Sequence, residues 1–375
     1  MLSQSKEAEV VRKALSAIGI VLLLLLAGCD FKEIDLRIFV LAIGVDPGEE
    51  EGAFKISLKL AIPQGDVTKI DEKMQILTEE SPSISEALRR MKSRVAKELD
   101  YSHCKSIILG EGIARKDIQH VMDWAVRRRD IQLILNFGVG RPEALRVLQV
   151  RPKSEHIPSN SLILAMSGQG TESPFISSVY SFQLMRNIYE KGIDPILPII
   201  EVTEDEEFLI NKIALLDSQK IKLVLTPNET RLYNLLSRSN LRTNLPAHFV
   251  GVMYQYYTER SSSDYKILNA ESGKVTIRYH IKIKGILEES SSPDLVTHSM
   301  LEKIAVAGGK ELEADVLALL TKIQASGLDP FGWGLHYGAR HFNNDTEMEV
   351  WERLYAGLDF QVKADVSIKY SGLIK

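Results

Sequence analysis

The sequence has 375 residues, of which 45% are hydrophobic and 26% are charged. This balance is typical of a globular chain with a full-sized core, and it excludes the disordered and fibrous classes. The net charge of −4 gives the chain no general attraction to phosphate backbones, so the composition argues against a nucleic-acid partner.

The N-terminal segment has the order of a secretory signal peptide. Arg12 and Lys13 precede an apolar run over residues 14–26, and small residues then lead to Cys29. The run is shorter than the roughly 20 residues that a membrane-spanning helix needs. We therefore predict a signal peptide over residues 1–28, with cleavage between Gly28 and Cys29.

The residues at this cleavage point, Leu26-Ala27-Gly28-Cys29, resemble the lipobox of bacterial lipoproteins. The two small residues fit a narrow peptidase cleft, and the thiol of Cys29 can be alkylated by a lipid donor. We predict lipidation of Cys29; the alternative is an uncleaved signal anchor with an incidental cysteine. Two or three acyl chains, at roughly 0.8 kcal/mol per buried methylene, would hold the chain on a membrane.

The mature chain offers no electrostatic substitute for this lipid. Removal of residues 1–28 takes away three basic and two acidic side chains, so the remainder is slightly more acidic than the whole. An acidic body is not attracted to an anionic membrane surface. Membrane attachment is therefore expected to come from the lipid or from a partner.

A β-hairpin is predicted at the start of the mature chain. Residues 38–45 form an apolar run, Asp46-Pro47-Gly48 is a turn sequence, and residues 53–60 alternate between apolar and polar. This alternation predicts a hairpin with one solvated face.

An α/β unit follows the hairpin. A capping box at Ser83 and Glu86 begins a predicted helix whose apolar stripe continues to Leu99. A buried strand, a second helix and a third strand are then predicted over residues 106–110, 118–125 and 131–139. Such a succession makes a sheet covered by helices.

The middle of the chain contains the predicted domain boundary. Residues 152–174 are rich in Ser, Pro, Gly and Asn and predict an exposed connection, and a helix is predicted over 175–191. Gly192-Ile193-Asp194-Pro195-Ile196-Leu197-Pro198 and an acidic run over 201–207 then interrupt the pattern. We place the main boundary near residue 200.

The second half begins with two short strands and a well-marked helix. Thr226, Pro227 and Glu229 occupy the N-cap, N1 and N3 positions of this helix, which is expected to bury Leu232, Leu235 and Leu236. The other predicted elements are strands over 213–216, 220–225, 274–284 and 358–370 and helices over 295–325 and 347–355. The strand over 274–284 alternates regularly and predicts one wet face.

Together these patterns predict a mixed α+β fold with several domains and no Rossmann or TIM-barrel signature. The length also favours more than one domain. The predicted division is a signal peptide over 1–28, an N-terminal region of two α/β subdomains over 29–200, and a C-terminal α+β domain over 201–375.

The sequence nominates no catalytic residue and no cofactor. It lacks the metalloprotease, phosphate-loop, hydrolase-elbow and CxxC motifs, so we predict that the chain is not an enzyme. Glu111 lies between a strand and a helix, where active-site carboxylates can be displayed, but no base accompanies it. His336 and His341 are spaced poorly for a shared metal ion, and Gly138-Val139-Gly140 lacks a third glycine. Cys104 is expected to be a small buried side chain.

Four motifs, in this order along nearly the whole chain, resemble the Ger(x)C lipoproteins, the C subunits of nutrient germinant receptors in spore-forming bacteria. The chain departs from that family at Asp30, where tryptophan is usual. The matching motifs are Gly28-Cys29-Asp30 with Val40-Leu41-Ala42-Ile43-Gly44-Val45-Asp46; Tyr101-Ser102-His103-Cys104-Lys105-Ser106-Ile107-Ile108-Leu109-Gly110-Glu111 with Ile113-Ala114-Arg115; Gly192-Ile193-Asp194-Pro195-Ile196-Leu197-Pro198; and Asp329-Pro330-Phe331-Gly332.

The resemblance implies a non-enzymatic subunit of three α/β or α+β domains, held by the Cys29 lipid on the outer face of the spore inner membrane. Its implied partners are the integral membrane A-type and B-type receptor subunits. A competing hypothesis is an extracytoplasmic solute-binding lipoprotein that captures a nutrient in a cleft between domains. The sequence identifies neither the nutrient nor any ligand-binding residue.

Overall fold

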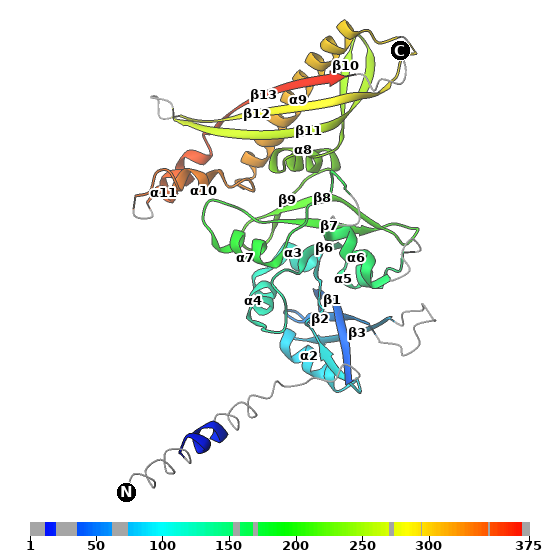
Figure 1. Ribbon diagram of the computed structural model, residues 1–375, viewed down its shortest axis with the longest axis vertical. Coiled ribbons are helices and arrows are strands. Elements are labelled where there is room, and N and C mark those ends of the chain that lie inside the picture. Colours follow the sequence, from blue (N-terminus) through cyan, green and yellow to red (C-terminus); the bar gives the residue numbers. More distant parts are fainter. Residues whose placement is uncertain are drawn as a thin grey trace. The chain divides into compact units, whose positions relative to one another are not determined.

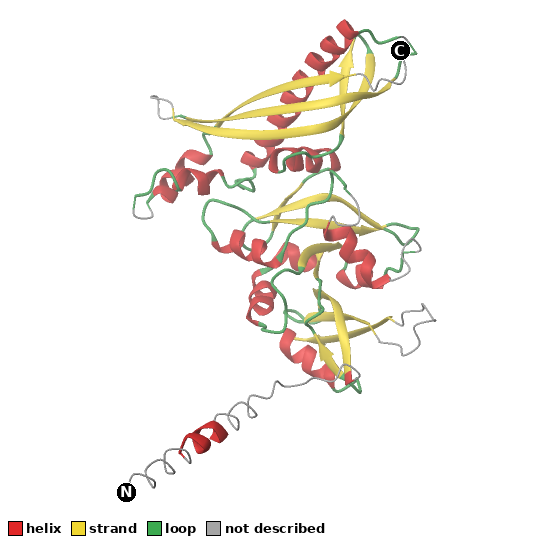
Figure 2. Ribbon diagram, in the orientation of Figure 1, coloured by secondary structure: helices red, strands yellow, loops and turns green. Residues whose placement is uncertain are grey.

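The computed structural model describes residues 12–19, 36–61, 74–152, 158–167, 172–269, 274–293, 295–343 and 346–369. Contacts separate residues 1–37, in which 12–19 are helical, from a compact unit over residues 38–375. The compact unit contains two mixed sheets packed with helices (Figures 1 and 2), which confirms the predicted α+β class.

The first sheet has nine strands in the described part of the chain, with the order β3-β2-β1-β5-β6-β7-β8-β9 and β4 paired to β1. Strands β1, β5, β6 and β7 are parallel to one another, and the remaining pairs along that order are antiparallel. Their bounds are β1 Arg37–Pro47, β2 Phe54–Ala61, β3 Met74–Ser81, β4 Glu98–Asp100, β5 Ser106–Gly110, β6 Asn136–Arg141, β7 Ile196–Val202, β8 Phe208–Leu216 and β9 Ile221–Val224.

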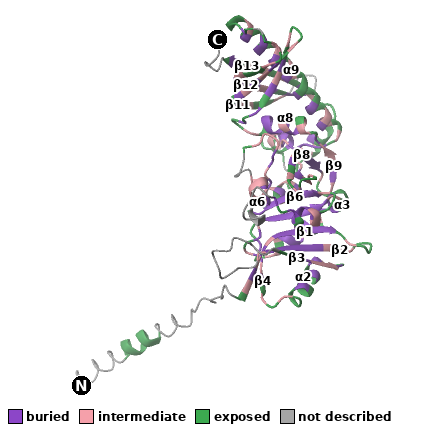
Figure 3. Cartoon of the chain, turned by 90° about the vertical axis from the view of Figure 1, so that its right-hand side faces the viewer, coloured by how far each residue is buried: buried purple, intermediate pink, exposed green. Residues whose placement is uncertain are grey.

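The predicted hairpin is confirmed, since β1 and β2 pair antiparallel up to Pro47 and Phe54. Its predicted solvated face is wrong. Both strands are mostly buried (Figure 3), and even Ser57 and Lys59 are almost inaccessible. Hydrophobic clusters lie on both faces of the sheet, and helix α5 (Ala144–Gln149) belongs to the second of them.

The first predicted helix ends earlier than its apolar stripe suggested, whereas the second lies where it was predicted. Helix α2 (Ile84–Lys92) starts at the predicted N-cap, where the Ser83 hydroxyl accepts a hydrogen bond from the Glu86 amide, but it ends before Leu99. Leu99 lies instead in β4, which pairs with β1. The predicted second helix is confirmed as α4 (Gln119–Arg127), whereas the short helix before it, α3 (Glu111–Lys116), had no sequence prediction.

The region predicted as an exposed connection contains a helix. Helix α6 (Pro158–Ser167) buries Leu162 and Met166 against the first sheet. The polar residues around this helix predicted a loop, but these apolar side chains cover the sheet face that also carries α5. The following helix, α7 (Ser181–Tyr189), is shorter than predicted. Strand β6 likewise starts later than predicted, at Asn136.

The second sheet has the order β10-β11-β12-β13, with β12 and β13 parallel. Helix α9 packs on one face of this sheet, as Figure 1 shows. The elements of this half are α8 Pro227–Ser237, β10 Asn244–Phe249, β11 Val252–Asn269, β12 Val275–Ser290, α9 His298–Ala325, α10 Trp333–Gly338, α11 Glu347–Tyr355 and β13 Asp359–Lys369.

Helix α8 confirms its predicted start in full. The Thr226 hydroxyl accepts from the Glu229 amide, and the Glu229 carboxylate accepts from the Thr226 amide. The three leucines predicted to be buried are buried. Strand β12 and helices α9 and α11 are also confirmed, whereas β10, β11 and α10 had no sequence prediction.

The first sheet extends past the predicted boundary near residue 200 and ends at Val224. Ile213 and Leu215, in its strand β8, pack into the hydrophobic cluster of the second sheet. The division into three domains stays a prediction.

Candidate functional site

The predicted lipidation and cleavage residues, Cys29 and Gly28, lie outside the described residues, so their prediction stands as it was made. Among the described residues, no helix combines the length and the hydrophobicity that crossing a membrane requires. Cys104 lies in a hydrophobic cluster of the first sheet and is fully buried, as predicted. Burial raises the pKa of its thiol to about 12.

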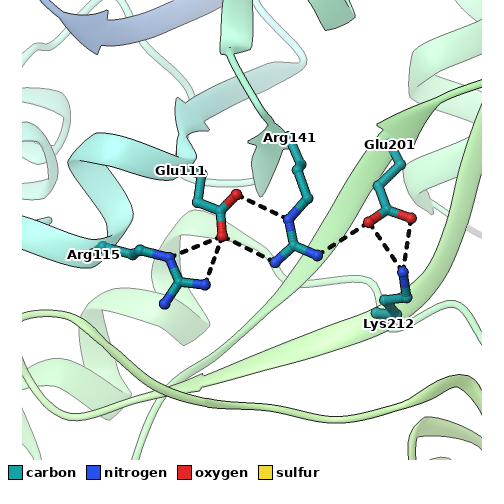
Figure 4. Close-up of polar contacts among 5 residues, drawn as sticks. All are labelled: Glu111, Arg115, Arg141, Glu201 and Lys212. Carbon is teal, nitrogen blue, oxygen red and sulfur yellow. Dashed lines mark hydrogen bonds and ion pairs between the residues drawn. The ribbon is translucent and has the colours of Figure 1, made fainter.

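A network of charged side chains lies where three parallel strands end (Figure 4). Glu111 follows β5 directly, Arg141 ends β6, and Glu201 lies near the end of β7. The Arg141 guanidinium donates to both oxygens of Glu111, from Nε at 2.9 Å and Nη2 at 3.0 Å, and from Nη1 to Glu201 at 3.1 Å. Lys212 donates to both Glu201 oxygens at 2.9 and 3.0 Å.

The ionisation of Glu111 decides whether this network could act in acid–base catalysis. Partial burial opposes ionisation, but hydrogen bonds from Arg141 and Arg115 outweigh it and lower the pKa of the Glu111 carboxyl group. A carboxylate held ionised by two guanidinium groups is a poor proton acceptor. The network is thus suited to joining the ends of three strands and not to acid–base chemistry. The sequence did not reveal it, because Glu111, Arg141 and Glu201 are 30 and 60 residues apart.

Asp46 forms a second buried polar contact at the end of β1. Its carboxylate accepts hydrogen bonds from the backbone amides of Ala144, at 2.7 Å, and Leu145, at 2.9 Å. Burial raises the pKa of Asp46 even so. A Cβ atom at Gly110 would lie 2.0 Å from Asp46 Oδ1, so only glycine fits there. These contacts join β1, β5 and the start of α5.

His336 and His341 occupy different surroundings. His336 belongs to α10, and His341 stacks on the Tyr337 ring with centroids 4.1 Å apart. In the described parts of the chain, no group of three or more His, Cys, Asp and Glu side chains could hold a metal ion.

Two motifs that the sequence placed 135 residues apart meet in the structure. The Asp194 amide donates to the Asp329 carbonyl oxygen at 2.8 Å, and the Asp329 amide donates to Asp194 Oδ2 at 2.6 Å. The Leu335 amide also donates to the Gly192 carbonyl oxygen at 2.8 Å. We call this contact between residues 192–194 and 329–335 the aspartate junction.

Asp329 is the buried centre of the aspartate junction. Its carboxylate accepts from the amides of Trp333, at 3.0 Å, and Gly334, at 2.7 Å. The indole of Trp333 is fully buried and donates to the Tyr279 hydroxyl of β12 at 2.8 Å. The junction thus links the segment before β7 to the core of the second sheet.

The stability of the chain should depend on pH through Asp329. Burial raises the pKa of its carboxyl group to about 7, against the opposing effect of the backbone hydrogen bonds. An unfolded aspartate titrates near 3.9. Between these values the folded chain retains a proton that the unfolded chain releases, so the free energy of unfolding falls as pH rises.

We therefore expect urea denaturation to show lower stability at pH 7.5 than at pH 5, with a slope approaching about 1.4 kcal/mol per pH unit at its steepest. Asp329→Asn should remove most of that slope. An unchanged slope in the variant would assign the pH dependence to other groups.

Comparison with known proteins agrees with the motifs. The family model described as "Spore germination protein N-terminal domain" matches residues 30–202, and "Spore germination B3/ GerAC like, C-terminal" matches residues 211–372. Spore germination protein B3 of Bacillus subtilis is 23% identical, over 93% of this chain and 94% of its own length. Spore germination protein GerQC of Bacillus cereus is 22% identical, over 94% and 98%.

The fold also has a solved counterpart. The crystal structure of the GerBC protein superposes with a TM-score of 0.54 and 18% identity, covering 92% of this chain and 100% of that one. At this identity the likeness concerns the fold alone.

Proposed function

Because the chain belongs to the Ger(x)C family of spore germination proteins, we propose that it is the lipid-anchored accessory subunit of a nutrient germinant receptor. The observation that carries the proposal is the match of both family models, in order, over residues 30–202 and 211–372. In this proposal the chain lies on the outer face of the spore inner membrane and assembles there with integral membrane A-type and B-type subunits.

The proposed role of the lipid is to raise the concentration of the folded body beside its partners. Tethering makes the second binding step intramolecular, so a modest protein–protein affinity is enough for assembly. Residues 38–375 form one compact unit, and the aspartate junction adds hydrogen bonds between segments on either side of the predicted boundary. Such a body would offer its partners a preorganised surface.

Replacement of Cys29 with alanine tests this proposal in spores. We expect the Cys29→Ala chain to be lost from inner membranes washed at high salt, which leaves lipid anchors in place, and nutrient-triggered germination to slow strongly, because one covalent lipid site would supply the anchor. Immunoblotting of membrane fractions and optical-density loss after nutrient addition measure the two effects.

Cys104→Ala is the matched control, since Cys104 is the other of the two cysteines and is buried. This variant should remain in the membrane fraction. Full membrane association and normal germination in the Cys29→Ala strain would refute the anchoring proposal.

One observation favours a second candidate function, capture of a nutrient in a cleft. A pocket of about 310 Å³ is lined by residues of the α7 region, such as Gln183 and Ile193, and by Tyr233 and Pro330 from the second half. Its volume is at the lower end of the range for small-molecule sites. Saturable heat in a calorimetric titration of the mature chain with amino acids or sugars would support this candidate, and its absence would remove it.

A further inference from the structure

The second sheet has one covered face and one open face. The buried residues of β12, such as Ile277, Tyr279 and Ile281, belong to the core that includes α9. The alternate residues Arg278, His280, Lys282 and Lys284 point to the opposite face, on which no described element packs. The sequence predicted this wet face, but one strand alone did not show which side chains of the neighbouring strands share it.

The strand register places further basic side chains beside these residues. In β11, Lys266 pairs with Arg278 and Arg260 pairs with Lys284. In β13, Lys363 pairs with His280. Residues paired directly across neighbouring strands project from the same face, so the basic side chains of three strands share one surface.

We call this surface the basic face. It carries seven basic side chains: Arg260, Lys266, Arg278, Lys282, Lys284, Lys363 and Lys369. The register places three acidic side chains on this face, Asp264, Asp359 and Asp365, which gives a local net charge of +4 with His280 neutral.

The whole chain, by contrast, has a net charge of −4, so charge is segregated to this face. Asp365 is engaged by His280, at 2.6 Å, and by Lys363, at 3.4 Å. The other acidic residues of these strands lie towards one end of the face: Glu259 in a bulge of β11, and Glu288 and Glu289 near the end of β12.

We propose that the basic face binds the phosphate groups of an anionic phospholipid surface. Lysine is depleted and aromatic residues are enriched at the cores of protein–protein interfaces. The outward residues of the rows from Lys266–Arg278–Gln361 to Arg260–Lys284–Ser367 include no Trp, Tyr or Phe, and the row of Lys369 adds one aromatic residue, Tyr257. Each lysine that reaches an anionic bilayer strengthens binding by roughly fivefold.

This assignment revises the expectation drawn from net charge. An acidic chain repels an anionic surface only on average, because attraction within a Debye length of roughly 8–10 Å depends on the charges nearest the surface. A lipid chain combined with a basic patch is a recognised pair of membrane signals. The inference rests on the proposed function for bringing the chain to a membrane, but its chemistry does not require Cys29.

Vesicle sedimentation of the mature chain without lipid tests the inference. The three hydrophobic clusters lie within residues 38–368, so a chain beginning at residue 29 with Cys29→Ser keeps every core residue. We expect it to bind vesicles containing phosphatidylglycerol, to bind pure phosphatidylcholine vesicles far less, and to dissociate as salt is raised.

A pair of double variants locates the binding. Lys282→Glu with Lys284→Glu should weaken binding by roughly 30-fold or more, from about 1 kcal/mol for each lysine. Lys303→Glu with Lys310→Glu makes the same change in net charge on exposed positions of α9, and it should alter binding by no more than about twofold.

Two results would overturn the inference: no preference for phosphatidylglycerol, or equal loss of binding in both double variants. Binding to the integral membrane subunits in neutral lipid that depends on Lys282 and Lys284 would assign the face to an acidic protein surface instead. Because the vesicle assay contains no lipidated chain, its failure leaves the Cys29→Ala result in spores unaffected, and the reverse is also true.

Discussion

Trp333→Ala is expected to lower the free energy of unfolding by about 3–5 kcal/mol, the usual cost of removing a large buried aromatic side chain. The indole has no exposed surface and packs beside the rings of Phe331, at 5.1 Å, and Phe360, at 5.3 Å. Its loss would also leave the Tyr279 hydroxyl without the hydrogen bond that it accepts. Both effects destabilise the core next to the aspartate junction.

Chemical denaturation followed by circular dichroism measures this cost. Trp333→Phe is the informative control, because it keeps an aromatic ring in the core and removes the indole N–H. It should cost distinctly less than Trp333→Ala. A loss below about 1 kcal/mol for Trp333→Ala would show that the cavity is refilled and that the junction does not depend on the indole.

Gly192→Ala is expected to have the second largest effect, about 3 kcal/mol or more, because it combines two penalties. Gly192 has φ of +80°, which costs a residue with a Cβ atom about 1–2 kcal/mol. Its added Cβ would also lie 2.5 Å from the Leu335 amide nitrogen, which donates to the Gly192 carbonyl. The backbone of the aspartate junction would have to separate.

Gly327→Ala separates the two penalties. Gly327 has nearly the same φ, +76°, and no atom lies within 4 Å of a Cβ built there. It should therefore cost only the conformational penalty. Equal losses of stability for Gly192→Ala and Gly327→Ala, measured by denaturation, would mean that close packing at residues 334–335 contributes nothing.

Local signals in the sequence predicted those elements that are bounded by capping or turn residues or that alternate regularly. The capping box at Thr226 and Glu229 and the alternation in β12 both describe contacts within a few residues. The helix predicted to reach Leu99 was overextended, because pairing of β4 with β1 uses that leucine in the sheet. Strand β11 was missed because register shifts near Gln255 and Thr258 disturb its period of two.

The sites depended on contacts that no short pattern contains. Glu111 was singled out from its place between a strand and a helix, but its partner Arg141, which also binds Glu201, arrives on another strand. The two motifs of the aspartate junction were each recognised, whereas their contact follows from folding alone. The basic face likewise required the register of β11, β12 and β13.

The most direct test of the proposed function is recovery of the tagged full-length chain from spore inner membranes, followed by identification of the proteins that remain bound in mild detergent. The account predicts that an A-type and a B-type integral membrane receptor subunit copurify with it. A chain that is recovered from the soluble fraction, or from membranes without either subunit, would contradict the account.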